Sequence, residues 1–536
     1  MRGIIAAGSP YSAEAGAEML RRGGNAVDAV VAATFASFMA EPSISAPGGG
    51  GFALLTGPGR EPVIYDFFCA TPGLGSGTAP DPAALDFLPV EVIYENSIGI
   101  YHIGRGSTAV PGNIAGLALM LEEGGTLPLG VVLEPAIRYA RDGLTVTPVQ
   151  AYIHRLIESL LRYDPRCWAL FERGGRLIQA GERYANPALA DTLERLARDG
   201  AATFYTGALA DAILAEQRPT DSRRGGLLTA EDLAAYRVIK RAPLRFAYKG
   251  YTVYTNPPPS AGGMLIAYGM RLFEHADLAG LTHGGTEHVA LLAEIMRQTE
   301  VARHRDQPHT LPDPAAWDAY LCDSCLDDDW EAVVRAFADG PAPAPSGPGG
   351  PSSTTHISVI DSTGLAVGMT TTPGETAGYV VGDTGLLMNN ILGEADLNPG
   401  GFFRFAPGVR LASMMAPTIV TDESGPRLVV GSGGSNRLRG AIFQALSNVL
   451  DWRLPIAAAV SQPRVHWEDG VLNLEGGYDP AAADALAARG YTVERWPGLN
   501  FYFGGTHAVY RAEDAGSGDA LRGAGDSRRD GAVVVE

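Results

Sequence analysis

A tract of low-complexity sequence constrains this chain more than any other feature. Residues 340–353 contain only Gly, Pro, Ala and Ser, and they end abruptly at Thr354. Such a tract cannot bury apolar surface or settle into regular structure, so we expect an exposed and flexible segment. One interpretation is an interdomain linker before an ordinary strand. The other is a self-cleaving precursor, in which the linker ends at a threonine that becomes an N-terminal nucleophile.

The residues after this tract predict a β-hairpin. Side chains alternate in character over residues 354–361, turn residues follow at 361–364, and a second strand continues over 365–370. A turn centred in this loop places Thr354 opposite Thr371, to within one residue.

The composition is that of an acidic, well-packed globular protein. The chain has 536 residues and a formal net charge of −19, which argues against a nucleic-acid or anionic membrane partner. No signal peptide or membrane span is visible near the N-terminus, so we expect a cytoplasmic protein. Cys322 and Cys325 have the spacing of a redox pair or half a zinc site, but no second pair accompanies them, and we interpret them as structural or incidental. We expect neither a metal nor a cofactor.

Hydrophobic patterning and turn residues predict a layered α+β fold. Asn25 is predicted to cap an apolar helix, and the glycine run 48–51 leads into a strand pair over 52–55 and 63–68. Four consecutive glycines indicate a backbone that another element approaches closely. Residues 130–240 are predicted to be mostly helical. Later elements are strands at 385–388, 418–421 and 428–430, a Gly-rich loop at 431–437 and a helix at 438–450.

A series of short motifs occurs in order along nearly the whole chain. They are residues 23–29 (GGNAVDA), 48–52 (GGGGF), 110–112 (VPG), 226–236 (GLLTAEDLAAY), 256–263 (NPPPSAGG), 354–359 (TTHISV) and 415–418 (MAPT). Together these motifs resemble the γ-glutamyltransferase family of N-terminal-nucleophile hydrolases.

The resemblance implies a four-layer αββα sandwich that is made as an inactive precursor. Cleavage between Ser353 and Thr354 would leave a large subunit, 1–353, and a small subunit, 354–536, which together form one αβ heterodimer. The freed α-amine of Thr354 would act as the general base for its own hydroxyl, because an α-amine titrates at about 7.7–8.0. His356 is then not needed for catalysis.

The resemblance also assigns the catalytic end of the site. Thr372 corresponds to the family's second active-site threonine, and we expect it to hydrogen-bond the nucleophile. The backbone N–H groups of Gly434 and Ser435 correspond to the oxyanion donors, and each such donor contributes about 2.7–4 kcal/mol. Without the resemblance, this loop would be interpreted as a tight turn before the following helix.

The acyl-binding end departs from the family pattern. Phe68 stands where γ-glutamyl enzymes have the arginine that binds the substrate α-carboxylate, and an apolar ring would leave that carboxylate desolvated and unpaired. Gly374 replaces an asparagine. Ile391, which follows Asn390, replaces a glutamine.

Some polar groups of the acyl-binding end are retained. Glu394 stands in place of the aspartate that holds the substrate α-ammonium, and Ser413 keeps one hydroxyl of a Ser-Ser pair. Arg105 and Arg437 are candidates to contact a substrate anion from another direction. The segment 396–410 is too short for the lid loop of many members, so we expect an open pocket.

The implied function is that of a glutathione hydrolase-like enzyme. It would form an acyl-enzyme on Thr354 from a small-molecule amide and pass the acyl group to water or an amine. The alternative is an acylase or amidase for a non-glutamyl acyl group, because of Phe68. An unprocessed, non-catalytic homologue is a more distant alternative.

Overall fold

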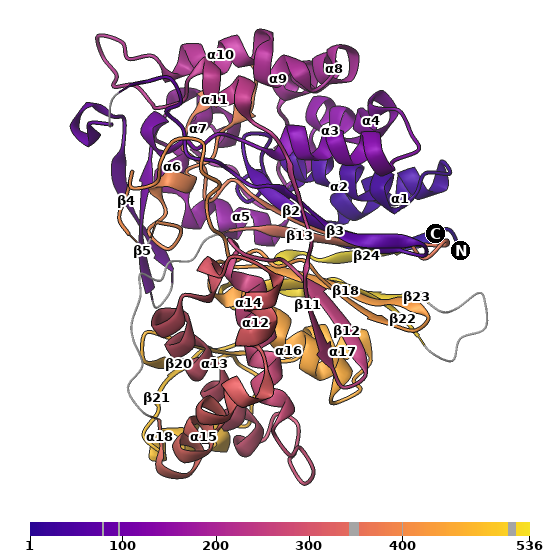
Figure 1. Ribbon diagram of the computed structural model, residues 1–536. Helices are drawn as coiled ribbons and strands as arrows, with labels where there is room; N and C mark the ends of the chain where they lie inside the picture. Colours follow the sequence, from indigo (N-terminus) through magenta and orange to yellow (C-terminus); the bar gives the residue numbers. More distant parts are fainter. Residues whose placement is uncertain (78–79, 95–96, 342–352, 399, 513–520) are drawn as a thin grey trace.

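Two antiparallel sheets stacked face to face form the centre of the computed structural model (Figure 1). The structure describes residues 1–77, 80–94, 97–341, 353–398, 400–512 and 521–536. Most of the tract that we expect to be flexible, residues 342–352, therefore lies outside the described residues.

The first sheet has the strand order β10-β3-β2-β14-β13-β1-β24. Its strands are β1 (Gly3–Ala7), β2 (Gly50–Gly57), β3 (Arg60–Phe67), β10 (Ile239–Arg241), β13 (Thr355–Asp361), β14 (Ala366–Thr372) and β24 (Ala532–Val535). Because β1 pairs with β24, the two ends of the chain lie side by side (Figure 1).

The second sheet has the order β11-β12-β17-β18-β22-β23. Its strands are β11 (Leu244–Tyr248), β12 (Tyr251–Thr255), β17 (Thr418–Asp422), β18 (Gly425–Gly433), β22 (Gly505–Arg511) and β23 (Leu521–Ala524). It packs on the first sheet chiefly where β18 and β22 cross β13 and β14.

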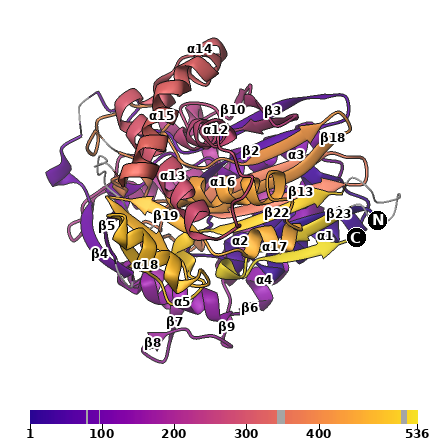
Figure 2. The same ribbon diagram turned by 90° about the horizontal axis from the view of Figure 1, so that it is seen from below.

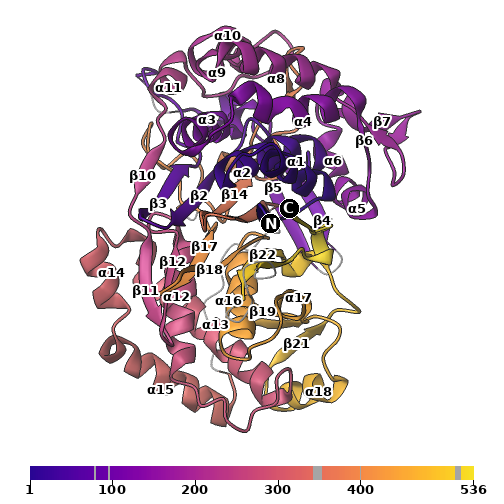
Figure 3. The same cartoon turned by 90° about the vertical axis from the view of Figure 1, so that its right-hand side faces the viewer.

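Helices cover the outer face of each sheet, which completes a four-layer αββα sandwich (Figure 3). The first sheet is covered by α1 (Pro10–Arg21), α2 (Ala26–Ala40) and α3 (Asn113–Gly124). The second is covered by α12 (Ala261–Glu274), α16 (Arg437–Leu450) and α17 (Ile456–Ser461), seen from below in Figure 2. The expected fold class is confirmed.

The remaining elements build outward from these layers. The helices are α4 (Leu129–Asp142), α5 (Pro148–Leu156), α6 (Glu158–Leu161), α7 (Pro165–Phe171), α8 (Pro187–Asp199), α9 (Ala202–Thr206), α10 (Ala208–Gln217), α11 (Ala230–Ala235), α13 (Thr286–Asp306), α14 (Pro314–Tyr320), α15 (Asp323–Asp339) and α18 (Pro480–Ala488). The short strands are β4 (Leu88–Tyr94), β5 (Ser97–Ile103), β6 (Leu144–Thr145), β7 (Glu172–Arg173), β8 (Arg176–Leu177), β9 (Arg183–Tyr184), β15 (Val380–Val381), β16 (Leu386–Leu387), β19 (Val465–Glu468), β20 (Val471–Leu474) and β21 (Thr492–Arg495).

The N-terminal helix cap predicted at Asn25 is present. The Asn25 side chain accepts from the backbone N–H groups of Val27 and Asp28, and the Asp28 carboxylate accepts from the N–H of Asn25 at 2.8 Å. Every residue of α2 is buried, as its apolar sequence predicts.

The predicted hairpin is formed by β13 and β14. Thr355 pairs with Thr371, so Thr354 directly precedes the first paired residue. The predicted register is confirmed to within the one residue allowed. On its other side β14 pairs with β2, where Thr372 lies opposite Gly50.

The glycine run before β2 is packed against backbone, as its sequence predicts. A Cβ added at Gly49 would lie 2.4 Å from the carbonyl oxygen of Thr372, and one added at Gly51 would lie 2.4 Å from that of Thr370. These positions exclude any side chain because the strand beside them is already in contact.

The helices of the described residues include none that is both long and apolar enough to span a bilayer.

We predict that Gly49→Ala lowers the thermal unfolding midpoint, because its methyl group would displace the Thr372 backbone at a cost of about 1–3 kcal/mol. Gly130→Ala is the matched control, since a Cβ there meets open space within α4. Alanine favours a helix over glycine, so the control should be neutral or slightly stabilising. Equal midpoints for the two variants in calorimetry would contradict the close approach.

Candidate active site

The peptide between Ser353 and Thr354 is buried at the start of β13. The hydroxyl of Thr372 donates a hydrogen bond of 2.5 Å to the carbonyl oxygen of Ser353. The same hydroxyl accepts from the N–H of Gly374 at 2.9 Å, which fixes its orientation. The acceptor of the Thr372 hydroxyl is thus the carbonyl of Ser353, the residue before the expected nucleophile.

The backbone of Thr354 is held on its other side by the second sheet. The guanidinium of Arg529 donates to the carbonyl oxygen of Thr354 at 3.1 Å and lies 3.8 Å from the centre of the Phe501 ring. A Cβ added at Gly433 would lie only 1.9 Å from that carbonyl oxygen. The end of β18 therefore touches the residue expected to be the nucleophile.

The Gly-rich loop after β18 presents two adjacent backbone donors. Among the described residues, neither the N–H of Gly434 nor that of Ser435 has a backbone or side-chain acceptor. Gly434 has a φ of 128° and Ser435 a φ of 49°, so both residues adopt a left-handed backbone. Two unsatisfied N–H groups in a buried loop are the arrangement that binds an oxyanion.

Two buried carboxyl groups lie near the start of β13. The carboxyl of Glu375 adjoins Ser353, and burial raises its pKa to about 8, although the charges of Arg529 and Arg437 oppose the shift. Glu41 accepts from the hydroxyl of Thr355 at 2.9 Å, and burial raises its pKa to about 7. Both carboxyl groups can therefore exchange a proton near neutral pH.

Three residues of the predicted acyl-binding end converge. A Cβ added at Gly374, whose φ is 75°, would lie 2.2 Å from both Asn390 Oδ1 and Glu394 Oε1. Asn390 Oδ1 also accepts from the N–H of Glu375 at 2.8 Å. An asparagine side chain at position 374 would not fit this arrangement.

Ser413 lines a separate cavity of about 340 Å³. The polar residues of its lining include Glu300, Arg303, His304, Asp396 and Asn436. Asp396 accepts from the Ser435 hydroxyl at 2.5 Å and Asn436 is the next residue, so this cavity adjoins the Gly-rich loop. It is the candidate substrate cavity.

Phe68 does not line this cavity. Its ring is buried and stacks on Phe52 at a centroid distance of 5.5 Å. Its carbonyl oxygen accepts from the Tyr236 hydroxyl and from Arg410. Arg410 also donates to the Arg237 carbonyl and lies 3.3 Å from a carboxylate oxygen of Asp66. The guanidinium of Arg410, which reaches the Phe68 backbone, is thus engaged by the protein itself.

Arg105 and Arg437, the two candidates to contact a substrate anion, lie in different surroundings. Arg105 is buried in ion pairs of 2.7 Å with Asp164 and Glu216, and a third carboxylate, that of Asp86, lies at 3.4 Å. These carboxylates engage its guanidinium, so the structure gives no support to a substrate contact for Arg105. Arg437 donates to the Tyr502 carbonyl at 3.1 Å, and its guanidinium lies 4.9 Å from the centre of the Tyr502 ring.

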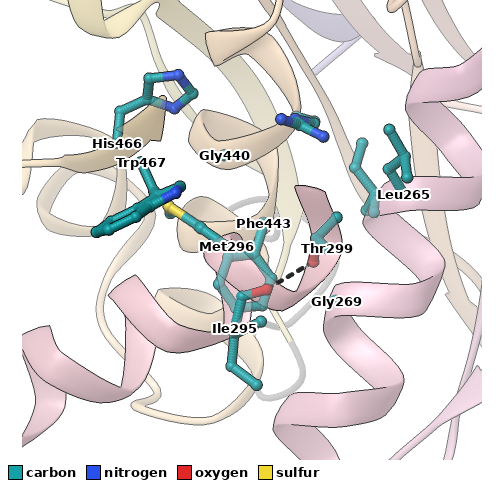
Figure 4. Close-up of a pocket in the computed structure, with 11 residues that line it drawn as sticks. Leu265, Gly269, Ile295, Met296, Thr299, Gly440, Phe443, His466 and Trp467 are labelled. Carbon is teal, nitrogen blue, oxygen red and sulfur yellow. Dashed lines mark hydrogen bonds between the residues drawn. The ribbon is translucent and has the colours of Figure 1, made fainter. Parts of the chain in front are cut away.

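A smaller cavity, of about 20 Å³, is lined by residues of α12, α13, α16 and β19 (Figure 4). Figure 4 shows Leu265, Met296 and Trp467 around it, with the Thr299 hydroxyl donating to the Ile295 carbonyl. This volume holds no more than about one water molecule, so the cavity is not a substrate site.

Cys322 and Cys325 lie at the N-terminal end of α15, in the outer helical layer (Figure 1). Both are free thiols whose sulfur atoms are 2.8 Å apart. No group of three or more metal-binding side chains occurs within the part of the chain that the structure describes.

Sequence reasoning missed Glu41, Glu375, Asp396 and Arg529. Glu375 lies three residues after Thr372, and that spacing could have drawn attention to it. The other three are brought to the site by tertiary structure, and no local pattern marks them.

Two sheets between two helical layers, with a buried threonine at the start of a central strand, define the N-terminal-nucleophile hydrolase fold. Consistent with this class, the structure is similar over 99% of its length to the crystal structure of cephalosporin acylase from Bacillus halodurans, covering 95% of that chain, with a TM-score of 0.83 and 25% identity.

The chain belongs to the γ-glutamyltranspeptidase family, whose sequence model matches residues 12–536. It is 33% identical to the acylase ACY 1 proenzyme of Pseudomonas sp. (strain V22), over all of this chain and 93% of that protein. It is 31% identical to the glutathione hydrolase proenzyme of Escherichia coli (strain K12), over 98% of this chain and 90% of that protein. The protein is thus an enzyme of a family that includes acylases and glutathione hydrolases.

We predict a pH-dependent stability penalty from Glu375. Its folded pKa of about 8 exceeds the value of about 4.3 in an unfolded chain, so the folded state binds more protons between these values. The free energy of unfolding then falls as the pH rises through this window. In an uncleaved Thr354→Ala background, Glu375→Gln should raise the unfolding midpoint by several degrees at pH 8–9 and by much less at pH 5.

Glu122→Gln, at an exposed carboxyl, is the matched control and should change the midpoint little at either pH. A Glu375→Gln effect of the same size at both pH values in calorimetry would contradict the prediction.

Proposed function

We propose that this protein is a self-cleaving amidohydrolase whose nucleophile is Thr354, which becomes N-terminal when the bond after Ser353 is cleaved. The observation that carries the proposal is the 2.5 Å hydrogen bond from the Thr372 hydroxyl to the Ser353 carbonyl oxygen. A donor on the carbonyl of the bond to be cleaved stabilises the negative charge that develops there during attack. The two relatives described above are both named proenzymes, which supports a maturation step.

In maturation, Thr354 Oγ1 adds to the carbonyl carbon of Ser353 and its proton leaves. The C–N bond between the two residues then breaks, and the nitrogen takes up a proton to become the α-amine of Thr354. Glu375, whose carboxyl adjoins Ser353, is placed to exchange these protons. Water hydrolyses the resulting ester and leaves the two subunits, 1–353 and 354–536, as a heterodimer.

In turnover, the α-amine of Thr354 removes the proton from its own hydroxyl, and the oxygen attacks the carbonyl carbon of a small amide. The developing oxyanion accepts hydrogen bonds from the N–H groups of Gly434 and Ser435, which have no acceptor among the described residues. The amine product leaves with a proton, and water or a second amine then removes the acyl group from the threonine ester.

For the acyl donor, we propose an acyl group that lacks the α-carboxylate of glutamate. The described residues provide no unengaged guanidinium at position 68, because Phe68 is buried and Arg410 is bound to backbone carbonyls and Asp66. A γ-glutamyl donor is the second candidate. The carboxyl of Glu394, beside Gly374, favours it because a carboxylate there could bind an α-ammonium group.

We predict that the purified 56.2 kDa chain yields fragments 1–353 and 354–536. Thr354→Ala should abolish cleavage. Thr372→Ala should slow it by about 10²–10³-fold, because one carbonyl donor is lost, while the matched Thr372→Ser keeps the hydroxyl and should cleave. Denaturing gels and intact-mass spectrometry measure the fragments. An uncut wild-type chain, or a fragment that begins at another residue, would refute the proposal.

We predict that butyryl-p-nitroanilide, whose acyl group has no carboxylate, is hydrolysed at least about tenfold more efficiently than γ-glutamyl-p-nitroanilide, because no guanidinium pairs with the glutamyl α-carboxylate. Comparison of kcat/KM for the two anilides measures the preference. Phe68→Arg should reduce it, whereas Phe68→Leu, which keeps the position apolar, should not. Selective γ-glutamyl hydrolysis by the wild type would favour the second candidate.

A further inference from the structure

The backbone of Ser435 is held in a conformation that serine seldom adopts. Its φ of 49° lies in the left-handed region, where a residue with a Cβ is strained and glycine is not. The loop has little room to relax. Gly433 is pressed against the Thr354 carbonyl on one side, and on the other the N–H of Leu438, in α16, donates to the Ser435 carbonyl at 3.1 Å.

The side chain of Ser435 supplies an interaction that offsets this strain. Its hydroxyl donates to Asp396 Oδ2 at 2.5 Å, which is a short hydrogen bond to an acidic group. Asp396 follows the short helix Ile391–Gly393 and belongs to a different part of the chain from the loop. The hydrogen bond therefore ties the loop to a separate segment.

The next residue is tied in the same way. Asn436 Oδ1 accepts from Arg303 of α13 at 3.2 Å, and its amide group donates to Glu468 of β19 at 3.3 Å. These contacts fix the residue after Ser435, so the peptide between them is anchored by side chains at both of its ends.

We propose that Asp396 is a positioning residue for catalysis. It holds Ser435 in the left-handed conformation and so directs the Ser435 N–H toward the oxyanion. The inference rests on the proposed function, because it gives a task to one of the two proposed oxyanion donors. Glycine adopts a positive φ without a side-chain anchor, so a glycine at position 435 makes Asp396 dispensable.

A direct contact with substrate is the competing role for Asp396, because its side chain lines the 340 Å³ cavity. The two roles predict different results when Asp396→Ala is combined with Ser435→Gly. A positioning role disappears in the glycine background, whereas a substrate contact persists there.

The test is a set of variants assayed with butyryl-p-nitroanilide. Asp396→Ala and Ser435→Ala should each lower kcat by about 10- to 100-fold with KM nearly unchanged, because one oxyanion donor is misdirected in the transition state. Ser435→Gly keeps the backbone N–H and serves as the reference background, in which adding Asp396→Ala should lower kcat by less than about threefold.

Three kinetic results would each overturn the proposal. They are an undiminished effect of Asp396→Ala in the Ser435→Gly background, a rise in KM without a fall in kcat, and wild-type turnover by both alanine variants. Cleavage at Thr354 is the control for folding. Since the Ser353 carbonyl is held by Thr372 and not by Ser435, all four variants should cleave as the wild type does. A specific block of cleavage in Asp396→Ala would also count against a positioning role.

A crystal structure of Asp396→Ala tests the inference without any substrate. Residue 435 should leave the left-handed region, whereas an unchanged backbone would overturn the proposal. This measurement distinguishes a failure of the proposed function from a failure of the positioning role. A wild-type protein that neither cleaves nor hydrolyses the anilide defeats the proposed function, and the backbone of residue 435 still decides whether Asp396 positions it.

Discussion

The pairing of β13 with β14 is the constraint on which the site depends. Side chains alternate between the two faces of a sheet, so a slip of one residue would turn the Thr372 hydroxyl away from the Ser353 carbonyl. The register is fixed from both sides, because β14 also pairs with β2 in the middle of a seven-stranded sheet. The contact at the Ser353–Thr354 peptide is thus set by the core of the sheet and does not depend on a loop.

Close backbone packing extends this constraint to the second sheet. Gly49 leaves room for the Thr372 carbonyl, and Gly433 leaves room for the Thr354 carbonyl. Neither position tolerates a Cβ. Backbone of the second sheet can therefore contact Thr354, while the residues before β2 contact Thr372, whose hydroxyl donates to the Ser353–Thr354 peptide. The same close packing buries charged side chains. Glu375 and Arg529 are fully buried beside that peptide, and the cost of desolvation is what moves the carboxyl pKa to about 8.

The sequence could predict features that depend on residues close together in the chain. The hairpin register follows from its turn, and the cap at Asn25 follows from residue type and spacing. Contacts between distant segments could not be predicted. Arg105 looked available because its sequence shows only a cation, whereas the fold surrounds it with three carboxylates. The hydrogen bond between Asp396 and Ser435 is invisible for the same reason, since only the folded chain joins two segments that share no motif.

The proposed catalytic end and the predicted acyl-binding end of the site depend on different parts of the chain. The residues of one end can therefore differ between relatives while those of the other stay the same. The proposed catalytic end uses backbone groups and small hydroxyls, and these are placed by strand pairing. The predicted acyl-binding end depends on side chains at the end of β3. There, Phe68 packs on Phe52 between the sheets, while Asp66 pairs with Arg241 and Arg410. A guanidinium at position 68 would have to be accommodated within this packing. An exchange of phenylalanine for arginine at position 68 is therefore also a change in the core and carries a cost in stability.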